Sequence, residues 1–370
     1  MLGLISVLLF LHPYVTYPLS LRLFRSVPIR FGDRNDLPTA TLVFSAFNEE
    51  ASMPEKIANL RAIREVVPNI QFKAYVDLST DRTLELLQAN SDLIDVHAAP
   101  ERTGKALGMR RLVAHSDTEV MIFTDANVIL DPATVPNLLR YFSDPAVGGV
   151  CGTLVYVNPG ESATAEVNSL YWRLEEYIKK NEARSGSTMG ADGSIFATRR
   201  AYYPEVPAHL LDDFIVSMSI VFAGLRLVSA PDVLAYEKLA EKSSDEFRRK
   251  RRIACRAYSS HRHLKPQLLR MAPINGYKYV SHRLIRWYGA ALAALSGLFL
   301  VLATLQLAGP IWATALAILG VGAAGLLIYG GFGPLSKMSE MGRAIWATML
   351  GVMDAWRGKR YQTWQPVQTR

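Results

Sequence analysis

VMIFTDAN, residues 120–127, is the stretch that decides the fold of this chain. It opens with apolar and β-branched residues, which predict a buried strand that ends at Thr124. Asp125 and Asn127 follow one residue apart, so their side-chain oxygens can face one cavity and hold Mg²⁺ or Mn²⁺. The alternative is an Asx-turn that does no more than end the strand.

Further strands and helices alternate around this stretch. Thr41–Ser45 and Phe72–Val76 have the same pattern of a buried strand, and helices are expected over 49–66 and 81–90. Strands that alternate with helices imply a parallel sheet with its functional site at the carboxyl ends of the strands. We therefore expect an α/β fold.

Acidic and basic motifs follow these elements in a fixed order. Acids at successive strand ends can hold a nucleotide diphosphate through a divalent cation, and a further acid can deprotonate an alcohol. The motifs are Phe47-Asn48-Glu49-Glu50, Asp77-Leu78-Ser79-Thr80-Asp81, Thr124-Asp125-Ala126-Asn127, Leu211-Asp212-Asp213-Phe214 and the basic run Arg248–Arg252. Their order resembles that of family 2 glycosyltransferases, specifically the membrane-bound branch that includes cellulose, chitin and hyaluronan synthases. The resemblance covers roughly the whole chain and implies the GT-A fold.

Two motifs resemble the part of the family's site that binds the nucleoside. Asn48 and Glu49 match an Asn-Glu-Glu motif, which implies hydrogen bonds to the ribose or uracil; the alternative is a helix start that Asn48 caps. Asp77 matches the acid that contacts the uracil. Leu78 replaces the usual glycine, which restricts the turn. Asp81 is expected to cap the next helix.

The diphosphate and the sugar have their own candidates. Asn127 stands where the family has the second acid of Asp-x-Asp, so it should bind the metal more weakly. In Arg102-Thr-Gly-Lys105, the glycine lets the backbone approach a diphosphate and Lys105 supplies a cation near the donor, unless it is a surface lysine. Asp192, in the glycine-rich segment Met189–Ser194, is expected to bind a sugar hydroxyl, unless the segment is a plain turn.

The pair Asp212 and Asp213 is the candidate for the base. A sugar hydroxyl is a poor nucleophile until a positioned carboxylate takes its proton. Adjacent carboxylates disfavour each other's ionisation, which raises the pKa of one of them. The resemblance to the family's Thr-Glu-Asp motif assigns Asp213 as the general base and Asp212 as its neighbour. The alternative is a pair of acids that caps a helix.

The basic run stands where processive synthases carry Gln-x-x-Arg-Trp. Arg249 replaces the glutamine, Arg252 matches the arginine, and Ile253 replaces the tryptophan. Arg252 is expected to neutralise the departing diphosphate. The missing tryptophan argues against handling of a polymer. For the other cations of the run, contact with anionic lipid is the alternative, and an aromatic platform for nucleic acid is missing.

Hydrophobic residues, half of the chain, concentrate at its two ends. Residues 1–26 are expected to form a transmembrane anchor, because a signal peptide would need a basic start and a cleavage site. Residues 287–332 hold two uncharged runs, Gly289–Ala308 and Ile311–Phe332, that predict a transmembrane hairpin. Residues 340–370 are expected to form an interfacial amphipathic helix and a basic tail.

The remaining segment, 38–280, is the expected GT-A domain. Basic residues lie where the apolar segments at the two ends of the chain join this domain. Their position predicts a multi-pass protein of the inner (plasma) membrane with a cytoplasmic catalytic domain. The net charge of +8 suits an anionic membrane surface. Two cysteines, Cys151 and Cys255, are too few for a disulfide framework.

These observations predict an inverting glycosyltransferase that depends on Mg²⁺ or Mn²⁺. It would move a hexose from a UDP-sugar to a lipid-linked or membrane-proximal glycan, with membrane lipids and no nucleic acid among its partners. A processive polysaccharide synthase with export is the first alternative. The second is a non-catalytic, membrane-tethered protein that binds a nucleotide sugar, for which Asn127 and Ile253 are the only support.

Overall fold

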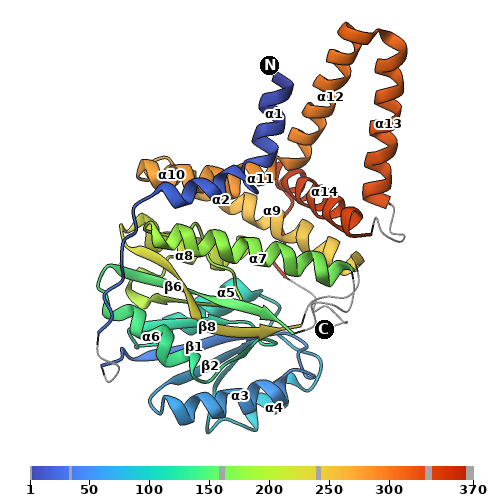
Figure 1. Ribbon diagram of the computed structural model, residues 1–370. Helices are drawn as coiled ribbons and strands as arrows, with labels where there is room; N and C mark the ends of the chain where they lie inside the picture. The colour runs from blue at the N-terminus through green and yellow to red at the C-terminus, as the bar shows by residue number, and fades with distance from the viewer. Residues whose placement is uncertain (1, 33–35, 158–162, 239–242, 330–335, 364–370) are drawn as a thin grey trace.

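An eight-stranded sheet forms one end of the molecule, and helices connect it to an apolar hairpin at the other end (Figure 1). The computed structural model describes residues 2–32, 36–157, 163–238, 243–329 and 336–363. The strand order is β3-β2-β1-β4-β7-β6-β8-β5. The strands are β1 (Ala40–Ala46), β2 (Gln71–Val76), β3 (Asp95–Ala98), β4 (Val120–Thr124), β5 (Ile129–Leu130), β6 (Val147–Tyr156), β7 (Ile195–Arg199) and β8 (Arg226–Glu237).

The helices fall into two groups, those that cover the sheet and those on the side of the hairpin. The first group is α3 (Met53–Val66), α4 (Thr83–Gln88), α5 (Lys105–Ala114), α6 (Thr134–Arg140), α7 (Ala163–Arg184) and α8 (Asp212–Phe222). The second is α1 (Leu2–Leu11), α2 (Thr16–Ser20), α9 (Ser243–Leu268), α10 (Pro273–Tyr279), α11 (Ile285–Trp287), α12 (Gly289–Ala308), α13 (Pro310–Tyr329) and α14 (Ser336–Trp356), with a π-helical turn at Val280–Leu284.

The sheet is mixed, which corrects the expectation of a parallel sheet. Strands β3, β2, β1 and β4 are parallel, and the predicted strand 120–124 coincides with β4. Strand β7 pairs antiparallel with both β4 and β6, while β8 runs parallel to β6. Strands β6 and β8 therefore run in the same direction as β4, and the exceptions among the described strands are β7, which follows the long helix α7, and the short β5, which is antiparallel to β8.

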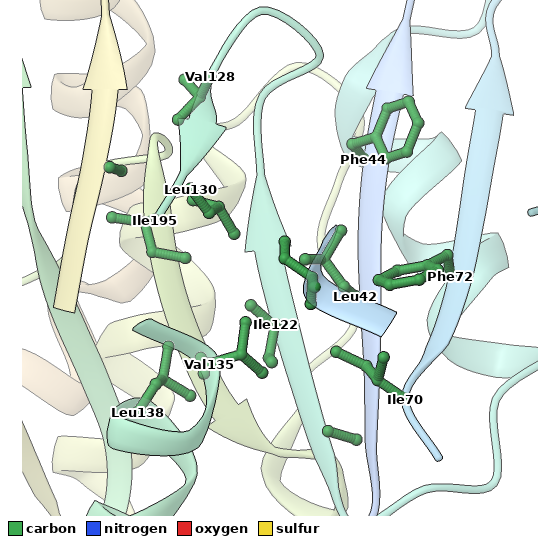
Figure 2. Packing of buried hydrophobic residues seen from close by; sticks show 14 of the residues in the cluster. Leu42, Phe44, Ile70, Phe72, Ile122, Val128, Leu130, Val135, Leu138 and Ile195 are labelled. Carbon is green, nitrogen blue, oxygen red and sulfur yellow. The ribbon is translucent and has the colours of Figure 1, made fainter. Parts of the chain in front are cut away.

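Strands β1 and β4 of the parallel half are buried at every position because both faces of the sheet are covered there. Leu42 and Phe44 of β1 pack into one core with Phe72 and Ile122, as Figure 2 shows. Val43, between them in sequence, points to the opposite core, since successive side chains of a strand alternate between faces. The two cores fix the register, which brings the carboxyl ends of β1, β2 and β4 together.

Within the described ranges, α12 and α13 are long and apolar enough to cross a membrane. They coincide with the predicted run Gly289–Ala308 and with most of the second run, whose end at 330–332 lies outside the described residues. The N-terminal segment is not one straight helix: α1 and the segment Thr16–Leu23 meet at a bend of 68° and together count as a third candidate span.

Helix α14 lies along α9 on the side of the hairpin. The backbone of Gly351 contacts Arg251 so closely that an added Cβ would lie 2.4 Å from the Arg251 carbonyl oxygen. The buried carboxylate of Asp354 accepts hydrogen bonds from the same arginine at 2.7 and 2.8 Å. Helix α14 is not among the candidate spans of the described chain. Residues 364–370 of the expected basic tail lie outside the described residues.

Gly108 of α5 offers a test of the packing between this helix and the sheet. An added Cβ would lie 2.2 Å from the ring of Tyr75. That ring is held in place because its hydroxyl shares a hydrogen bond with the Thr103 hydroxyl and accepts another from Arg111. We expect Gly108→Ala to lower the free energy of unfolding by about 1–3 kcal/mol, the usual cost of overpacking a core. Urea unfolding followed by tryptophan fluorescence measures this.

The control for that experiment is Gly276→Ala in α10, where an added Cβ would meet no atom within 4 Å. Alanine is the better helix former there, so this variant should be neutral or slightly more stable. Equal loss of stability in both variants would contradict the proposed packing of α5 against β2.

Candidate active site

The loops after β1 and β2 are bound to each other. The amide oxygen of Asn48 accepts a hydrogen bond from the Thr80 N–H at 2.8 Å, and the Asn48 N–H donates to the hydroxyl of Ser79 at 3.1 Å. Asn48 and Leu78 both have φ in the left-handed region, at 52° and 54°. Glycine adopts this conformation without strain and leucine does not, which agrees with the restriction expected at Leu78.

Asp81 and Glu49 complete this joint between the loops. The Asp81 carboxylate accepts the Thr83 N–H at the start of α4, at 3.0 Å, and the Glu50 N–H at 3.0 Å. Burial acts to raise the pKa of Asp81, but the hydrogen bonds from Thr83 and Glu50 lower it overall. The Glu49 carboxylate accepts from Ser52 at 3.2 Å. Asp81 therefore caps α4, as its position predicted.

The carboxylate of Asp77 organises the loop that leads to Lys105. It is fully buried and accepts hydrogen bonds from Arg102 Nε at 3.1 Å, from the N–H and hydroxyl of Thr103 at 2.7 and 3.0 Å, and from the Gly104 N–H at 3.0 Å. Gly104 needs its left-handed φ of 86° to make this turn. The predicted contact of Asp77 with a uracil stays a prediction.

Lys105, Asp125 and Asp213 come together from three different elements. Lys105 begins α5, and its Nζ lies 2.5 Å from Asp125 Oδ1 at the end of β4. An added Cβ at Gly193 would lie 3.1 Å from both Lys105 Nζ and Asp213 Oδ2, so both groups lie close against this glycine. Burial acts to lower the pKa of Lys105, but Asp125, Asp212 and Asp213 raise it overall.

The two acids of the candidate base motif lie in the first turn of α8. Burial, and then repulsion from Asp212, raises the pKa of Asp213 to about 7, although Lys105 and the Phe214 N–H act in the opposite direction. The Phe214 N–H donates to Asp213 at 2.6 Å. Arg256 of α9 lies 3.5 Å from Asp212 and donates to the carbonyl of Leu210. Asp213 is thus a carboxylate that titrates near neutral pH.

Sequence reasoning did not find Lys56 and Glu237 near the candidate metal ligands. Buried Lys56 donates from Nζ to the carbonyls of Asp125 and Val128 at 3.1 and 2.6 Å, which shapes the turn after β4. Burial lowers the pKa of Lys56 to about 7 against the opposing charge of Asp125. The amide nitrogen of Asn127 donates to Glu237, at the end of β8, at 3.4 Å.

The donors at this turn suit a hard divalent cation. No group of three histidine, cysteine, aspartate or glutamate residues in the described part of the chain could hold a metal by itself. Magnesium sites commonly use one or two carboxylates together with substrate phosphates. Asp125 and the amide oxygen of Asn127 fit that donor set, provided that the ammonium of Lys105 gives up its place beside Asp125.

Two other predicted site residues, Asp192 and Arg249, lie in ion pairs, and a third, Arg252, lies on the same helix as Arg249. Asp192 pairs with buried Lys179 at 2.9 Å. Arg249 lies 3.5 Å from Glu246; burial acts to lower its pKa, but Glu246, Glu237 and nearby groups raise it overall. Arg252 is half-buried on the same helix. The spacing of Arg249, Arg252 and Arg256 puts all three guanidinium groups on one face of α9.

The segment after α14 reaches the loop that Asp77 organises. Gln362 donates from Nε2 to the carbonyl of Thr103 at 3.3 Å. The backbone carbonyl oxygen of Gln362 would lie 2.3 Å from a Cβ added to Gly104. Only glycine at position 104 allows this approach. No motif in the sequence indicated that the two segments meet.

The family assignment follows from a comparison with known families. The model of "Glycosyl transferase family 2" matches residues 41–206, the segment that carries Asn48, Asp77, Lys105 and Asp125. Residues 41–206 of this chain match a family 2 glycosyltransferase domain. The expected enzyme class is confirmed at that level, and the expected GT-A fold is confirmed with a mixed sheet.

Two curated glycosyltransferases are similar to parts of the chain. The O-antigen chain rhamnosyltransferase RfbN of Salmonella typhimurium is 24% identical over 142 residues, which are 36% of this chain and 45% of that protein. An N-acetylglucosaminyltransferase of Rhizobium leguminosarum bv. trifolii is 24% identical over 136 residues, which are 35% of this chain and 74% of that protein. The match thus spans less than half of the rhamnosyltransferase.

A solved structure resembles nearly the whole fold. The mannosyltransferase PcManGT of Pyrobaculum calidifontis, in complex with GDP-Man and Mn²⁺, has a TM-score of 0.68 at 20% identity and covers 95% of this chain and 99% of its own. These similar proteins transfer rhamnose, N-acetylglucosamine or mannose. The expected relation to the cellulose and chitin synthase branch is therefore not supported, and the family 2 domain is what the motifs identified correctly.

The position of Lys105 in this glycosyltransferase domain predicts a change in pH dependence. Since Lys105 lowers the pKa of Asp213, Lys105→Gln should move that pKa above about 7. A base must be ionised to act, so the acidic limb of the pH profile of kcat/KM should move to higher pH. Lys73→Gln, which breaks an ion pair with Asp95 on β3, is the control. An unmoved limb would show that Asp213 and Lys105 do not interact during catalysis.

Proposed function

We propose that this protein transfers a hexose from a nucleoside diphosphate sugar to an acceptor hydroxyl, with inversion at the anomeric carbon. One observation carries the proposal: Asp213, with a pKa near 7, lies beside Lys105, which is itself paired with Asp125. A carboxylate with this pKa is ionised about half of the time at neutral pH and accepts a proton readily. Direct in-line attack then needs no covalent intermediate.

The residues of the site divide the work between acceptor and donor. Asp213 takes the proton of the acceptor hydroxyl, and Asp212 keeps its pKa high. Lys105, Arg249 and Arg252 supply positive charge for the departing diphosphate. Asn48, Glu49 and Asp77 belong to the side that binds the nucleoside, and Asp192 to the side that binds the sugar. All these roles follow the family motifs. The match over 41–206 covers the segment that holds Asn48, Glu49, Asp77, Lys105 and Asp192, whereas Asp212, Asp213, Arg249 and Arg252 lie beyond it.

A divalent cation, Mg²⁺ or Mn²⁺, is the proposed cofactor. When bound, it neutralises the diphosphate of the donor. Asp125 and Asn127 would hold it. The mannosyltransferase of similar fold binds Mn²⁺ together with its nucleotide sugar, which supports this role for a cation at the same kind of site.

The motifs favour UDP as the carrier, and the acceptor we propose is a lipid-linked or membrane-proximal glycan. The candidate spans α12 and α13, together with the bent N-terminal pair, support a multi-pass protein of the inner membrane. We propose an anchor at 1–26, a cytoplasmic domain at 38–280, a hairpin at 287–332 and an interfacial helix with a tail at 340–370. Ile253, in place of the tryptophan of the synthases, favours addition of one sugar over processive synthesis.

Asp213→Asn tests the proposed base. The full chain in lipid nanodiscs, given Mn²⁺ and a panel of UDP-sugars and GDP-mannose, should release nucleoside diphosphate from one donor. The variant should lose about 10²–10⁴-fold in rate, because an amide cannot accept the proton. Asp117→Asn, an exposed acid before β4, is the control. Full activity of Asp213→Asn with the same donor would refute the assignment of the base.

Asn127→Asp tests the proposed cation site. A second carboxylate beside Asp125 should tighten binding of Mn²⁺ about tenfold, since carboxylate charge sets the affinity of such sites. Titration with Mn²⁺, followed by electron paramagnetic resonance in the presence of UDP, measures the affinity. Asn90→Asp, two residues after the end of α4, makes the same substitution away from the proposed site and is the control. Unaltered Mn²⁺ affinity in Asn127→Asp would place the ion elsewhere.

A further inference from the structure

A cavity of about 610 Å³ lies where the ends of α9 and α14 meet, lined by Tyr258, His261, Arg262, Lys265 and Trp356. Its lining contains two cations, an imidazole and two large aromatic rings, and no acid. Neither Arg262 nor Lys265 makes a salt bridge with any residue of the described chain. A concave site with uncompensated positive charge fits an anionic group.

The aromatic wall of this cavity joins it to the base of the membrane hairpin. The hydroxyl of Tyr258 lies 2.7 Å from that of Tyr288, the residue that precedes α12. The ring of Trp356 lies 6.1 Å from Tyr258 and 6.4 Å from Tyr288. The side chain of Trp356 is 52% exposed. Tryptophan and tyrosine gather at the level of lipid headgroups, where one end of the ring is apolar and the other meets water.

The position of the cavity relative to α12 agrees with the level of the lipid headgroups. Helix α12 starts at Gly289, directly after Tyr288, and its 20 residues are the length needed to cross the hydrocarbon core. A cavity beside Tyr288 therefore lies at the boundary of the membrane, where the phosphate groups of lipids are found. Arg262 and Lys265, both exposed, can extend toward such a phosphate.

The cavity is separate from the transfer site. Tyr258, Arg262 and Lys265 are spaced by four and three residues and share one face of α9. A different face of the helix contacts the loop before Asp213, because Ser260 accepts the Leu211 N–H at 2.9 Å and Arg256 donates to Leu210. A headgroup in the cavity would thus bind on the far side of α9 from the proposed base.

From these observations we infer that the cavity binds the phosphate headgroup of an anionic membrane lipid, through Arg262 and Lys265 and against the rings of Tyr258 and Trp356. The inference rests on the membrane placement proposed above. It does not require transfer activity, and the lipid it binds is not the acceptor.

Quenching of tryptophan fluorescence by brominated lipids tests this site. The full chain is placed in phosphatidylcholine nanodiscs that contain a small fraction of either brominated phosphatidylglycerol or brominated phosphatidylcholine. The signal from Trp356, obtained as the difference from Trp356→Phe, should be quenched more strongly by the anionic lipid. The double variant Arg262→Gln/Lys265→Gln should weaken the preference for that lipid about tenfold, since each cation adds to the attraction.

Three controls separate the possible outcomes. Arg61→Gln/Lys180→Gln removes the same charge from exposed positions outside the cavity and should keep the preference. Asp213→Asn should keep it as well, so failure of the proposed transferase leaves this result intact. Inorganic phosphate should not relieve the quenching. Equal quenching by both lipids, equal loss in the charge control, or displacement by inorganic phosphate would overturn the inference.

Discussion

The ammonium of Lys105 is the charge on which the site depends. It begins α5, pairs with Asp125 at the end of β4, and lies in the field of Asp212 and Asp213 at the start of α8. Three buried or half-buried carboxylates in one place would repel one another without it. The loop that positions this lysine is held in turn by the buried carboxylate of Asp77. The parallel strands thus position the acids of the site through a single cation, the ammonium of Lys105.

Helix α9 connects this site to the helices on the side of the hairpin. One face carries Arg256 and Ser260, which hold the loop before the proposed base. Another face carries Arg251, whose guanidinium pairs with Asp354 of α14. A rigid helix with contacts on two sides transmits the position of one layer to the other. Contacts with the proposed base motif and with α14 are therefore made by the same helix.

The sequence predicted what depends on local pattern. The run 120–124 is β4 as expected, and Asp125, Lys105 and Asp213 do meet. What it did not predict depends on contacts between distant segments. The antiparallel direction of β7, the carbonyls that Lys56 bonds and the pairing of Asn127 with Glu237 have no local signal. Lys56 reads as an ordinary surface residue of a helix, and only the folded turn after β4 explains its burial.

Glu182, a buried acid of α7, joins the helices on the side of the hairpin to the loops beside the sheet. Glu182 accepts hydrogen bonds from Tyr17 of α2 and from the Met189 N–H, and it contacts His282 at 2.9 Å. Burial acts to raise the pKa of Glu182, but His282 and the hydrogen bonds keep it below its ordinary value. Arg283, next along the chain, donates to the carbonyls of Met189 and Gly190. These contacts fix the loop that leads to Gly193, where Lys105 and Asp213 meet. Residues before β1 and after α9 therefore take part in shaping the site, although the family motifs end well inside those limits.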